Sequence, residues 1–123
     1  MKPSRILVID DDHRFLELVE QYLKRHGWRV FTASDARQGL MEIRRNMPNV
    51  ILADMLLRNS DGFQLVKSIK EDKDCKQIPV IAITGLAGAV ERLRCFKAGC
   101  DDVLSKPFSL DELGRRLEDL GNY

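Results

Sequence analysis

The sequence predicts an α/β domain in which helices cover both faces of a parallel β-sheet. Five short apolar runs recur at intervals of roughly twenty to thirty residues, and a stretch with helical periodicity follows each of them. The run at 50–53 is continuously apolar, as expected for a strand that is buried on both faces. Repeated strand–helix units of this kind form one parallel sheet with helical crossovers.

The length and composition indicate one globular domain at 1–123. The chain is 44% hydrophobic and 32% charged, and 123 residues is close to the commonest domain size. A net charge of +1 gives no reason to expect direct binding to nucleic acid or to a membrane surface.

No apolar run is long enough for a membrane helix and no signal peptide precedes the first strand, so we expect a cytoplasmic location. The three cysteines lack a CxxC spacing, which favours reduced thiols.

The first strand is expected at 5–10, where an apolar run ends in acidic residues. A helix with one apolar face follows and ends at Gly27. Its apolar positions are Phe15, Leu18, Val19, Tyr22 and Leu23. The alternating residues 28–32 predict an edge strand with one wetter face. A second helix follows, capped by Ser34 or Asp35.

The third strand is expected in the apolar run 50–57, in which Asp54 stands where the strand reaches the surface. A helix starts near Gly62, and the fourth strand is expected at 78–84, with a proline tolerable at its beginning. A flexible loop at 85–88 then leads into the fourth helix. The fifth strand is short, at 103–105, and the last helix has Ser109 and Glu112 at capping-box spacing.

Right-handed crossovers leave few topologies for five such units, and the flavodoxin-like strand order 2-1-3-4-5 fits best. The carboxyl ends of parallel strands meet at one edge of the sheet, where open α/β sheets bind ligands. The polar residues expected there are Asp10, Asp11, Asp12, Asp54, Thr84 and Lys106. A cap, a turn or a solvated charge explains each one alone, but their common position favours a site.

These residue types suit phosphoryl transfer to a carboxylate. Several carboxylates in one crevice repel one another unless a cation is present, and hard oxygen ligands favour Mg²⁺ over zinc. A lysine and a magnesium ion can bind two oxygens of the phosphoryl group, and a threonine hydroxyl can hydrogen-bond the third oxygen. The nucleophile would be a carboxylate. Nucleotide binding has no support, because the chain has neither a Walker loop nor GxGxxG.

Five motifs stand in order along the chain. They are Asp10-Asp11 after the first apolar run, Asp54 after the third, Asp61-Gly62, Thr84 after the fourth, and residues 98–102 leading to Lys106-Pro107-Phe108. By these motifs the chain resembles, over essentially its whole length, the receiver domain of a two-component response regulator, the CheY-like family.

The resemblance implies a role for each site residue. Asp54 would accept the phosphoryl group, giving a 4-aspartylphosphate. Asp11 would bind Mg²⁺ directly and Asp10 through water, with Asp54 and the backbone carbonyl of Leu56 completing the ligands. Thr84 and Lys106 would contact the phosphoryl group. The Lys106-Pro107 peptide bond would be cis, and Asp12 would only help to begin the first helix.

The resemblance also implies a signalling switch and its partners, not a turnover enzyme. A histidine kinase or histidine phosphotransfer protein would dock beside the first helix, near Phe15 and Leu18. The fourth and fifth helices would form the output surface and a possible homodimer contact. That surface carries Arg92, Arg94, Lys97, Arg115 and Arg116, which are expected to be solvated. The chain is either a stand-alone receiver or an N-terminal domain whose output domain lies beyond Tyr123.

Three positions depart from the usual family pattern. Arg58 stands where proline is common, Gly85 stands where alanine is common, and Val103 stands where many members carry Tyr or Phe. Because valine cannot make an aromatic swing, we expect output mainly through the 85–88 loop. Leu56 and Leu86 are apolar where polar residues often position hydrolytic water, so slow loss of the phosphoryl group is expected.

Two alternatives stay open. A small haloacid-dehalogenase-type phosphatase would use the DxD of 10–12, but Lys106 follows the acidic pair at 101–102 instead of preceding it. A phosphorylation-independent interaction module would keep the fold but needs no acceptor. The acceptor, acidic pair and lysine are all present, while Arg58 and Val103 keep this second alternative open.

Overall fold

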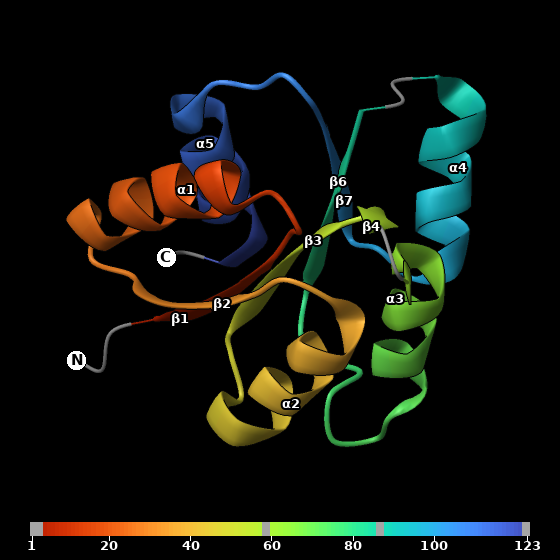
Figure 1. Ribbon diagram of the computed structural model, residues 1–123. Coiled ribbons are helices and arrows are strands. Elements are labelled where there is room, and N and C mark those ends of the chain that lie inside the picture. Colours follow the sequence, from red (N-terminus) through yellow and green to blue (C-terminus); the bar gives the residue numbers. More distant parts are fainter. Residues whose placement is uncertain (1–3, 58–59, 86–87, 122–123) are drawn as a thin grey trace.

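The computed structural model describes residues 4–57, 60–85 and 88–121, and these contain one parallel sheet with helices on both faces (Figure 1). The strands of this sheet are β1 (Arg5–Ile9), β2 (Arg29–Ala33), β3 (Val50–Asp54), β6 (Val80–Thr84) and β7 (Asp102–Ser105). The helices are α1 (His13–Arg25), α2 (Ala36–Asn46), α3 (Gly62–Glu71), α4 (Ala89–Ala98) and α5 (Leu110–Gly121). Two short strands, β4 (Leu56–Leu57) and β5 (Ser60–Asp61), pair separately.

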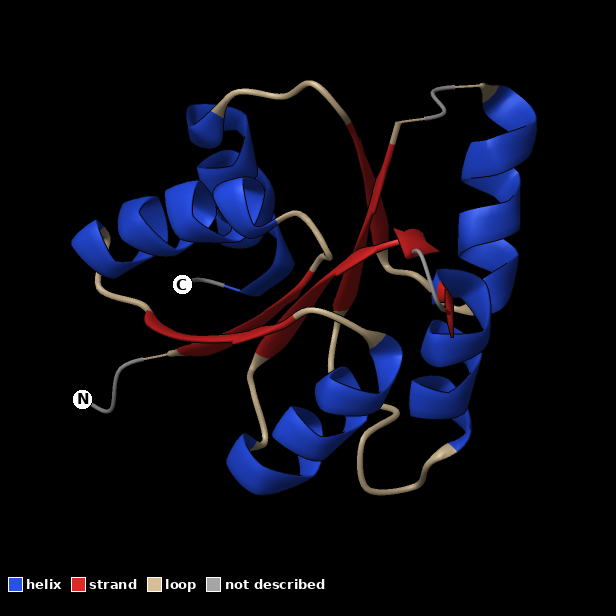
Figure 2. Ribbon diagram, viewed as in Figure 1, coloured by secondary structure: helices blue, strands red, loops and turns tan. Residues whose placement is uncertain are grey.

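The sheet order is β2-β1-β3-β6-β7, and every neighbouring pair is parallel. This confirms the flavodoxin-like order 2-1-3-4-5 predicted from the sequence. Helices α1 and α5 cover one face of the sheet, and α2, α3 and α4 cover the other (Figures 1 and 2). Strands β1 and β3 lie side by side at the centre, so their carboxyl ends are neighbours.

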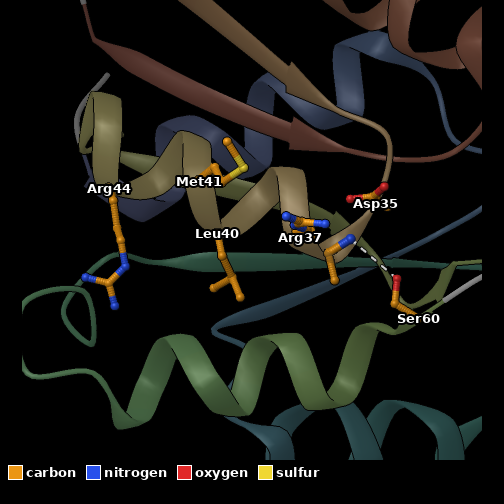
Figure 3. Close-up of a pocket in the computed structure, with 7 residues that line it drawn as sticks. Asp35, Arg37, Leu40, Met41, Arg44 and Ser60 are labelled. Atoms are coloured by element: carbon orange, nitrogen blue, oxygen red, sulfur yellow. Dashed lines mark hydrogen bonds between the residues drawn. The ribbon is translucent and has the colours of Figure 1, made fainter.

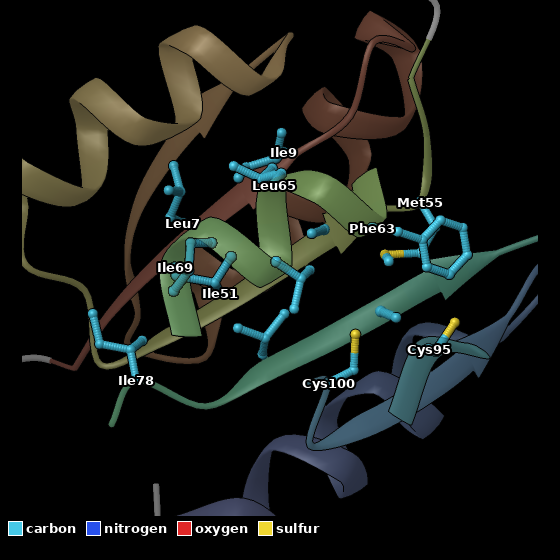
Figure 4. Packing of buried hydrophobic residues seen from close by; sticks show 14 of the residues in the cluster. Leu7, Ile9, Ile51, Met55, Phe63, Leu65, Ile69, Ile78, Cys95 and Cys100 are labelled. Atoms are coloured by element: carbon cyan, nitrogen blue, oxygen red, sulfur yellow. The ribbon is translucent and has the colours of Figure 1, made fainter. Parts of the chain in front are cut away.

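Alternating side chains of the central strands fill two separate hydrophobic clusters. In β1, Ile6 and Val8 face α1 and α5, whereas Leu7 and Ile9 face the other helices. The same alternation continues along β3 and β6. The cluster that contains Leu7 and Ile9 also holds side chains of α3 and three buried cysteines, of which Figure 4 labels Cys95 and Cys100. Burial on both faces explains why these strands are continuously apolar in sequence.

Side-chain caps fix where the helices begin. Asp12, Asp35 and Asp61 are the N-cap residues of α1, α2 and α3, and each carboxylate accepts a backbone N–H from the first turn. The Ser109 hydroxyl accepts the N–H of Glu112, so the predicted capping contact at α5 is confirmed. Gly27 follows α1 with φ +88°, which favours glycine.

Some expected boundaries differ from the structure. Strand β6 begins at Val80, because Pro79 lacks the N–H that a strand residue would donate. The third strand, expected over 50–57, ends at Asp54, and the separate antiparallel pairing of β4 with β5 was not predicted. Of the loop at 85–88, residues 86–87 lie outside the described residues, as does Arg58, so the expected freedom of both loops stays a prediction.

Within the described part of the chain, no helix is long and apolar enough to span a membrane.

Gly62 allows α3 to start directly against the end of β3. A Cβ at this position would lie 2.5 Å from Met55 Cα and 2.7 Å from the Asp54 carbonyl oxygen. Both are backbone atoms, so neither can rotate away. The glycine therefore sets how closely α3 approaches the residue that ends β3.

We expect Gly62→Ala to destabilise the protein by about 1–3 kcal/mol, as overpacking does, although alanine is the better helix former. Urea unfolding followed by circular dichroism measures this change. Gly85→Ala is the matched control, because a Cβ at Gly85 meets nothing within 4 Å. A Gly62→Ala variant as stable as the control would show that α3 can move away from β3 freely.

Candidate functional site

The carboxyl ends of the strands bring the predicted polar residues to one edge of the sheet. Asp10 follows β1, Asp54 ends β3, Thr84 ends β6, and Lys106 follows β7. Within the described chain, Asp10, Asp54 and Thr84 are the polar side chains that the fold buries. Burying a polar group is costly unless its partners compensate, so three at one edge indicate a purpose other than folding.

Three carboxylates gather in an open cleft at this edge. Oxygen atoms of Asp10, Asp11 and Asp54 lie within 4.8 Å of one another. The cleft has a volume of about 630 Å³ and is lined by Asp10, Asp11, Asp12, His13, Arg14, Asp54 and Lys106. Carboxylates from strands far apart in sequence therefore face one solvent-accessible space.

Asp10 is fully buried and is held from two directions. Its Oδ1 accepts the backbone N–H of Asp12 at 2.9 Å, and its Oδ2 accepts a hydrogen bond from Lys106 Nζ at 3.0 Å. The first contact fixes the turn that leads into α1. The second brings the end of β7 to the end of β1, and a charge-assisted bond of this kind is stronger than a neutral one.

The Asp54 carboxylate accepts one backbone hydrogen bond and lies near one positively charged side chain. Its Oδ1 accepts the N–H of Leu56 at 2.9 Å, and its Oδ2 lies 4.0 Å from Lys106 Nζ. Burial raises the pKa of Asp54 to about 6, and the charges of Asp10 and Asp11 add to the increase. The Leu56 hydrogen bond and the Lys106 charge act in the opposite direction but do not cancel it.

Lys106 directly follows the last residue of β7, and its side chain extends to the carboxylates at the ends of β1 and β3. The Lys106-Pro107 peptide bond is cis, as predicted. The Lys106 backbone N–H donates to the Thr84 carbonyl at 2.8 Å, which ties this part of the chain to the end of β6. The Lys106 ammonium also lies 4.3 Å from the centroid of the Phe15 ring. The side chain thus contacts or approaches Asp10 after β1, Asp54 at the end of β3 and Phe15 on α1.

The donor set fits a hard divalent cation. Three carboxylates bring oxygen ligands of the type that Mg²⁺ prefers. Lys106 supplies one positive charge to Asp10 and lies near Asp54, so the local charge stays negative. A divalent ion would offset the repulsion that contributes to the raised pKa of Asp54.

Of the six residues to which the resemblance assigns a role in binding Mg²⁺ or the phosphoryl group, Asp10, Asp11, Asp54 and Lys106 line the cleft. Thr84 is fully buried beside it and does not line the cleft, and Leu56 contributes a backbone N–H to Asp54. The functional roles assigned to all six stay predictions.

Two residues that line the cleft, His13 and Arg14, were missed by the sequence reasoning. Their only signal was their position directly after the acidic run, in the first turn of α1. Phe15 was expected as an apolar and docking position on the first helix, but its contact with Lys106 was not predicted. Because α1 begins at the carboxyl end of β1, its first residues necessarily lie beside the site.

A groove of about 440 Å³ adjoins the acidic cleft along α1. Phe15, Leu18, Pro107 and Phe108 line it, with Asp12, Val19, Lys106 and Leu110 completing the walls. The two residues that the sequence suggested as a docking position therefore lie in the wall of one apolar groove. Leu18 is 55% exposed, which leaves apolar surface available there.

Another hollow, of about 570 Å³, lies beside α2 and shares no lining residue with the acidic cleft (Figure 3). Leu40 and Met41 form its apolar part, with Arg37 and Arg44 near them. The backbone N–H of Ala36 donates to the Ser60 hydroxyl at 3.4 Å across it. It contains no residue that the sequence analysis assigned to the site.

Of the basic side chains on α4 and α5, Arg94, Lys97 and Arg115 are exposed, in line with the expected solvated surface, and two arginines of this surface also contact neighbouring elements. Arg116 donates to Asp102 at 2.7 Å, and the Arg94 guanidinium lies 3.9 Å from the Phe63 ring centroid. These arginines connect α5 to β7 and α4 to α3. The apolar side chains Val90 and Leu93 of α4 are exposed at 81% and 55%.

The comparisons with known proteins agree with one another. Residues 6–118 match the family model described as "Response regulator receiver domain". The response regulator PleD of Caulobacter vibrioides is 33% identical over 120 residues, covering 98% of this chain and 26% of that protein. The chain spans about a quarter to a half of the length of the curated relatives it matches.

Two solved structures are similar over nearly their whole length. The receiver domain of the Francisella response regulator 1452 has a TM-score of 0.88 and 31% identity, covering 97% of this chain and 96% of that one. The receiver domain of the sensor histidine kinase PA1611 of Pseudomonas aeruginosa has a TM-score of 0.87 and 30% identity, covering 96% and 97%. That structure has a magnesium ion coordinated in its active-site cleft.

The raised pKa of Asp54 predicts how stability depends on pH without metal. The native state holds the Asp54 proton more tightly than the unfolded chain, so this stabilisation is present at low pH. It is lost as the pH rises from about 4 through about 6. Asp54→Asn removes the buried charge, and we expect it to raise the free energy of unfolding by about 1–3 kcal/mol at pH 7.5.

Urea unfolding in a chelator at pH 7.5 and near pH 4.5 measures the effect, which should shrink at the lower pH. Glu17→Gln on α1 is the matched control, because it changes an exposed carboxylate away from the cleft. An Asp54→Asn variant less stable than wild type at pH 7.5 would mean that its contacts outweigh its desolvation.

Proposed function

The chain belongs to the response regulator receiver domain family of two-component systems, and we propose that it accepts a phosphoryl group on Asp54. Receiver domains are signalling switches, and residues 1–123 would act as one such domain. The observation that carries the proposal is the pairing of Asp54 with Lys106 at an open cleft that already holds two further carboxylates.

In the proposed reaction the Asp54 carboxylate attacks the phosphorus of a phosphohistidine or of a small acyl phosphate. A P–O bond to Asp54 forms as the bond to the donor breaks, and the electron pair of that bond stays on the departing nitrogen or oxygen. The Leu56 N–H fixes the orientation of the carboxylate through a 2.9 Å hydrogen bond. Only the ionised carboxylate is nucleophilic, so its raised pKa makes a nearby cation important.

Mg²⁺ would be held by Asp10, Asp11, Asp54 and the backbone carbonyl of Leu56, with Asp10 acting through water. When bound, the ion supplies positive charge to the phosphoryl oxygens and to the carboxylates. The acidic cluster of this chain supports this assignment. The magnesium ion in the cleft of the PA1611 receiver domain supports it as well.

Lys106 and Thr84 are proposed to receive the transferred phosphoryl group. Lys106 Nζ lies 4.0 Å from Asp54, so a small displacement of the ammonium would let it pair with a phosphoryl oxygen. Thr84 is fully buried at the end of β6 and is linked to Lys106 through its carbonyl. Movement at Lys106 would therefore act on the chain at Thr84 and on the loop that follows.

A signal of this kind must reach a surface that other proteins contact. Val103 on β7 is fully buried, and its small side chain leaves no ring to turn inward. We propose that output passes mainly through the 85–88 loop to α4, where Val90 and Leu93 are exposed. This surface and α5 are also the proposed homodimer contact.

The proposed donor is a histidine kinase or a histidine phosphotransfer protein that docks in the groove beside Phe15 and Leu18. This groove adjoins the acidic cleft, so a bound donor would hold its phosphohistidine near Asp54. The curated relatives are longer than this chain, which is consistent with an output domain beyond it. We do not expect this domain to bind nucleic acid itself.

Incubation with Mg²⁺ and a small acyl phosphate, followed by intact-mass measurement, tests the proposal. We expect one base-labile phosphoryl group on the wild-type protein and none on Asp54→Asn. Lys106→Ala should be phosphorylated at least about tenfold more slowly, because the ammonium no longer stabilises the developing charge. Lys97→Ala, an exposed lysine on α4, is the matched control and should behave as wild type.

An unmodified wild-type protein would contradict the proposal and favour an interaction module that needs no phosphorylation. Hydrolysis of a generic phosphoester with turnover would favour a phosphatase of the haloacid-dehalogenase type instead. A phosphoryl group found on another residue would contradict the assignment of Asp54.

The phosphorylated protein is expected to lose its phosphoryl group slowly. Leu56, whose N–H binds Asp54, has a side chain that is 54% exposed and cannot orient an attacking water. The other apolar position in this argument, Leu86, lies outside the described residues. We expect Leu56→Asn to shorten the lifetime several-fold, measured as decay of the phosphorylated mass after the donor is removed.

Leu93→Asn on α4 is the matched control, because Leu93 is 55% exposed and lies outside the cleft lining. Rapid decay of the wild-type phosphoprotein, or an unchanged lifetime in Leu56→Asn, would show that Leu56 does not determine this rate.

A further inference from the structure

We propose that Phe15 is a positioning residue for Lys106, and that the face of its ring holds the ammonium group between Asp10 and Asp54. The inference rests on the proposed function, because its consequence is measured in phosphoryl transfer to Asp54. It adds a residue that the acidic cluster alone does not indicate.

The contacts around Lys106 Nζ carry the proposal. The ammonium lies 4.3 Å from the Phe15 ring centroid, 3.0 Å from Asp10 Oδ2 and 4.0 Å from Asp54 Oδ2. A cation within about 6 Å of a ring centroid, over its face, is attracted by the electron-rich face. The Lys106 side chain keeps 30% of its surface exposed, so the other contacts do not fully enclose it.

Two separate elements hold the Phe15 ring in place. Its backbone N–H donates to the Asp12 side chain at 3.3 Å, within the cap that begins α1. Its ring meets Phe108 edge to face, with the centroids 5.9 Å apart and the planes at 84°. Because edge-to-face pairs restrict ring orientation, the ring is fixed by α1 on one side and by the segment after β7 on the other.

At position 15, beside Lys106, an aromatic ring is better suited than a further carboxylate would be. The lysine side chain is long and flexible, and without a further contact its ammonium can pair with Asp10 or turn to solvent. A carboxylate in place of Phe15 would hold the ammonium but would also offset the charge needed by the phosphoryl oxygens. The ring attracts the ammonium without adding a negative charge.

The same ring lies in the wall of the groove proposed for the phosphoryl donor, together with Pro107 and Phe108. A docked donor would cover this part of the groove and remove water from the Lys106–Phe15 contact. Contacts of this kind strengthen when they are desolvated. Phe15 would thus link docking of the phosphoryl donor to the position of the Lys106 ammonium.

The competing explanation is that Phe15 only packs against Phe108. Fluorination separates the two explanations, because fluorine atoms withdraw charge from the ring face while the ring stays apolar and close to its original shape. A packing role predicts little effect of fluorination, whereas attraction of a cation predicts a graded loss.

The experiment replaces Phe15 site-specifically with mono-, di- and trifluorinated phenylalanine in the full chain. The rate of phosphorylation by a small acyl phosphate with Mg²⁺ is then measured. A small donor is used so that loss of protein docking does not contribute. We expect the rate to fall stepwise, by about three- to tenfold for the trifluorinated ring, in line with the strength of such contacts.

Phe15→Leu should be slowed at least as much, and Phe15→Tyr should keep the wild-type rate. The matched control is the same series at Phe96, which lies under Arg92 at 5.9 Å on α4, away from the cleft; fluorination there should change nothing.

A readout independent of activity is the NMR signal of the Lys106 methylene protons. In wild type the Phe15 ring should shift them upfield, and Phe15→Leu should remove the shift. An unshifted Lys106 signal, or equal rates across the Phe15 series in a phosphorylated protein, would overturn the positioning role. An upfield signal in a wild-type protein that is never phosphorylated would support the contact and contradict the proposed function.

Discussion

The repulsion among three carboxylates at one edge of the sheet is the constraint on which the site depends. Asp10, Asp11 and Asp54 share one cleft, and burial adds to the cost of charging Asp54. Lys106 offsets part of this repulsion through a 3.0 Å hydrogen bond to Asp10 but stays 4.0 Å from Asp54. The negative charge of the site is therefore only partly neutralised, which makes the site attractive to a divalent cation.

A network of hydrogen bonds ties the opposite end of the sheet together. Lys70 Nζ donates to the Ile78 carbonyl and to Asp101, and the same Asp101 oxygen accepts the N–H of Val80. These bonds join α3 to the starts of β6 and β7. With one end fixed in this way, changes at Asp54 are expected to alter the loops at the other end and leave the sheet itself in register.

Sequence patterns were sufficient for the sheet order and the acidic cleft, because burial on both faces and strand-end polarity leave direct traces in the sequence. The cis bond at Lys106-Pro107 followed only from the resemblance to the receiver family. The β4–β5 hairpin escaped prediction, since two-residue strands are too short to show a period. Phe15 was predicted on the apolar face of the first helix and near the docking position, but nothing in the sequence indicated that it meets Lys106. Its contact with Lys106 depends on how α1 lies against the end of β7, which only the structure shows.

Calorimetric titration with Mg²⁺ at pH 7, on wild type and on Lys106→Met, tests the central claim most directly. If the carboxylates form a cation site whose negative charge is only partly neutralised, wild type should bind one ion per chain. Lys106→Met should then bind it several-fold more tightly, because a competing positive charge has been removed. No binding to wild type, or equal or weaker binding to Lys106→Met, would contradict the claim that this lysine and the metal balance the same charges.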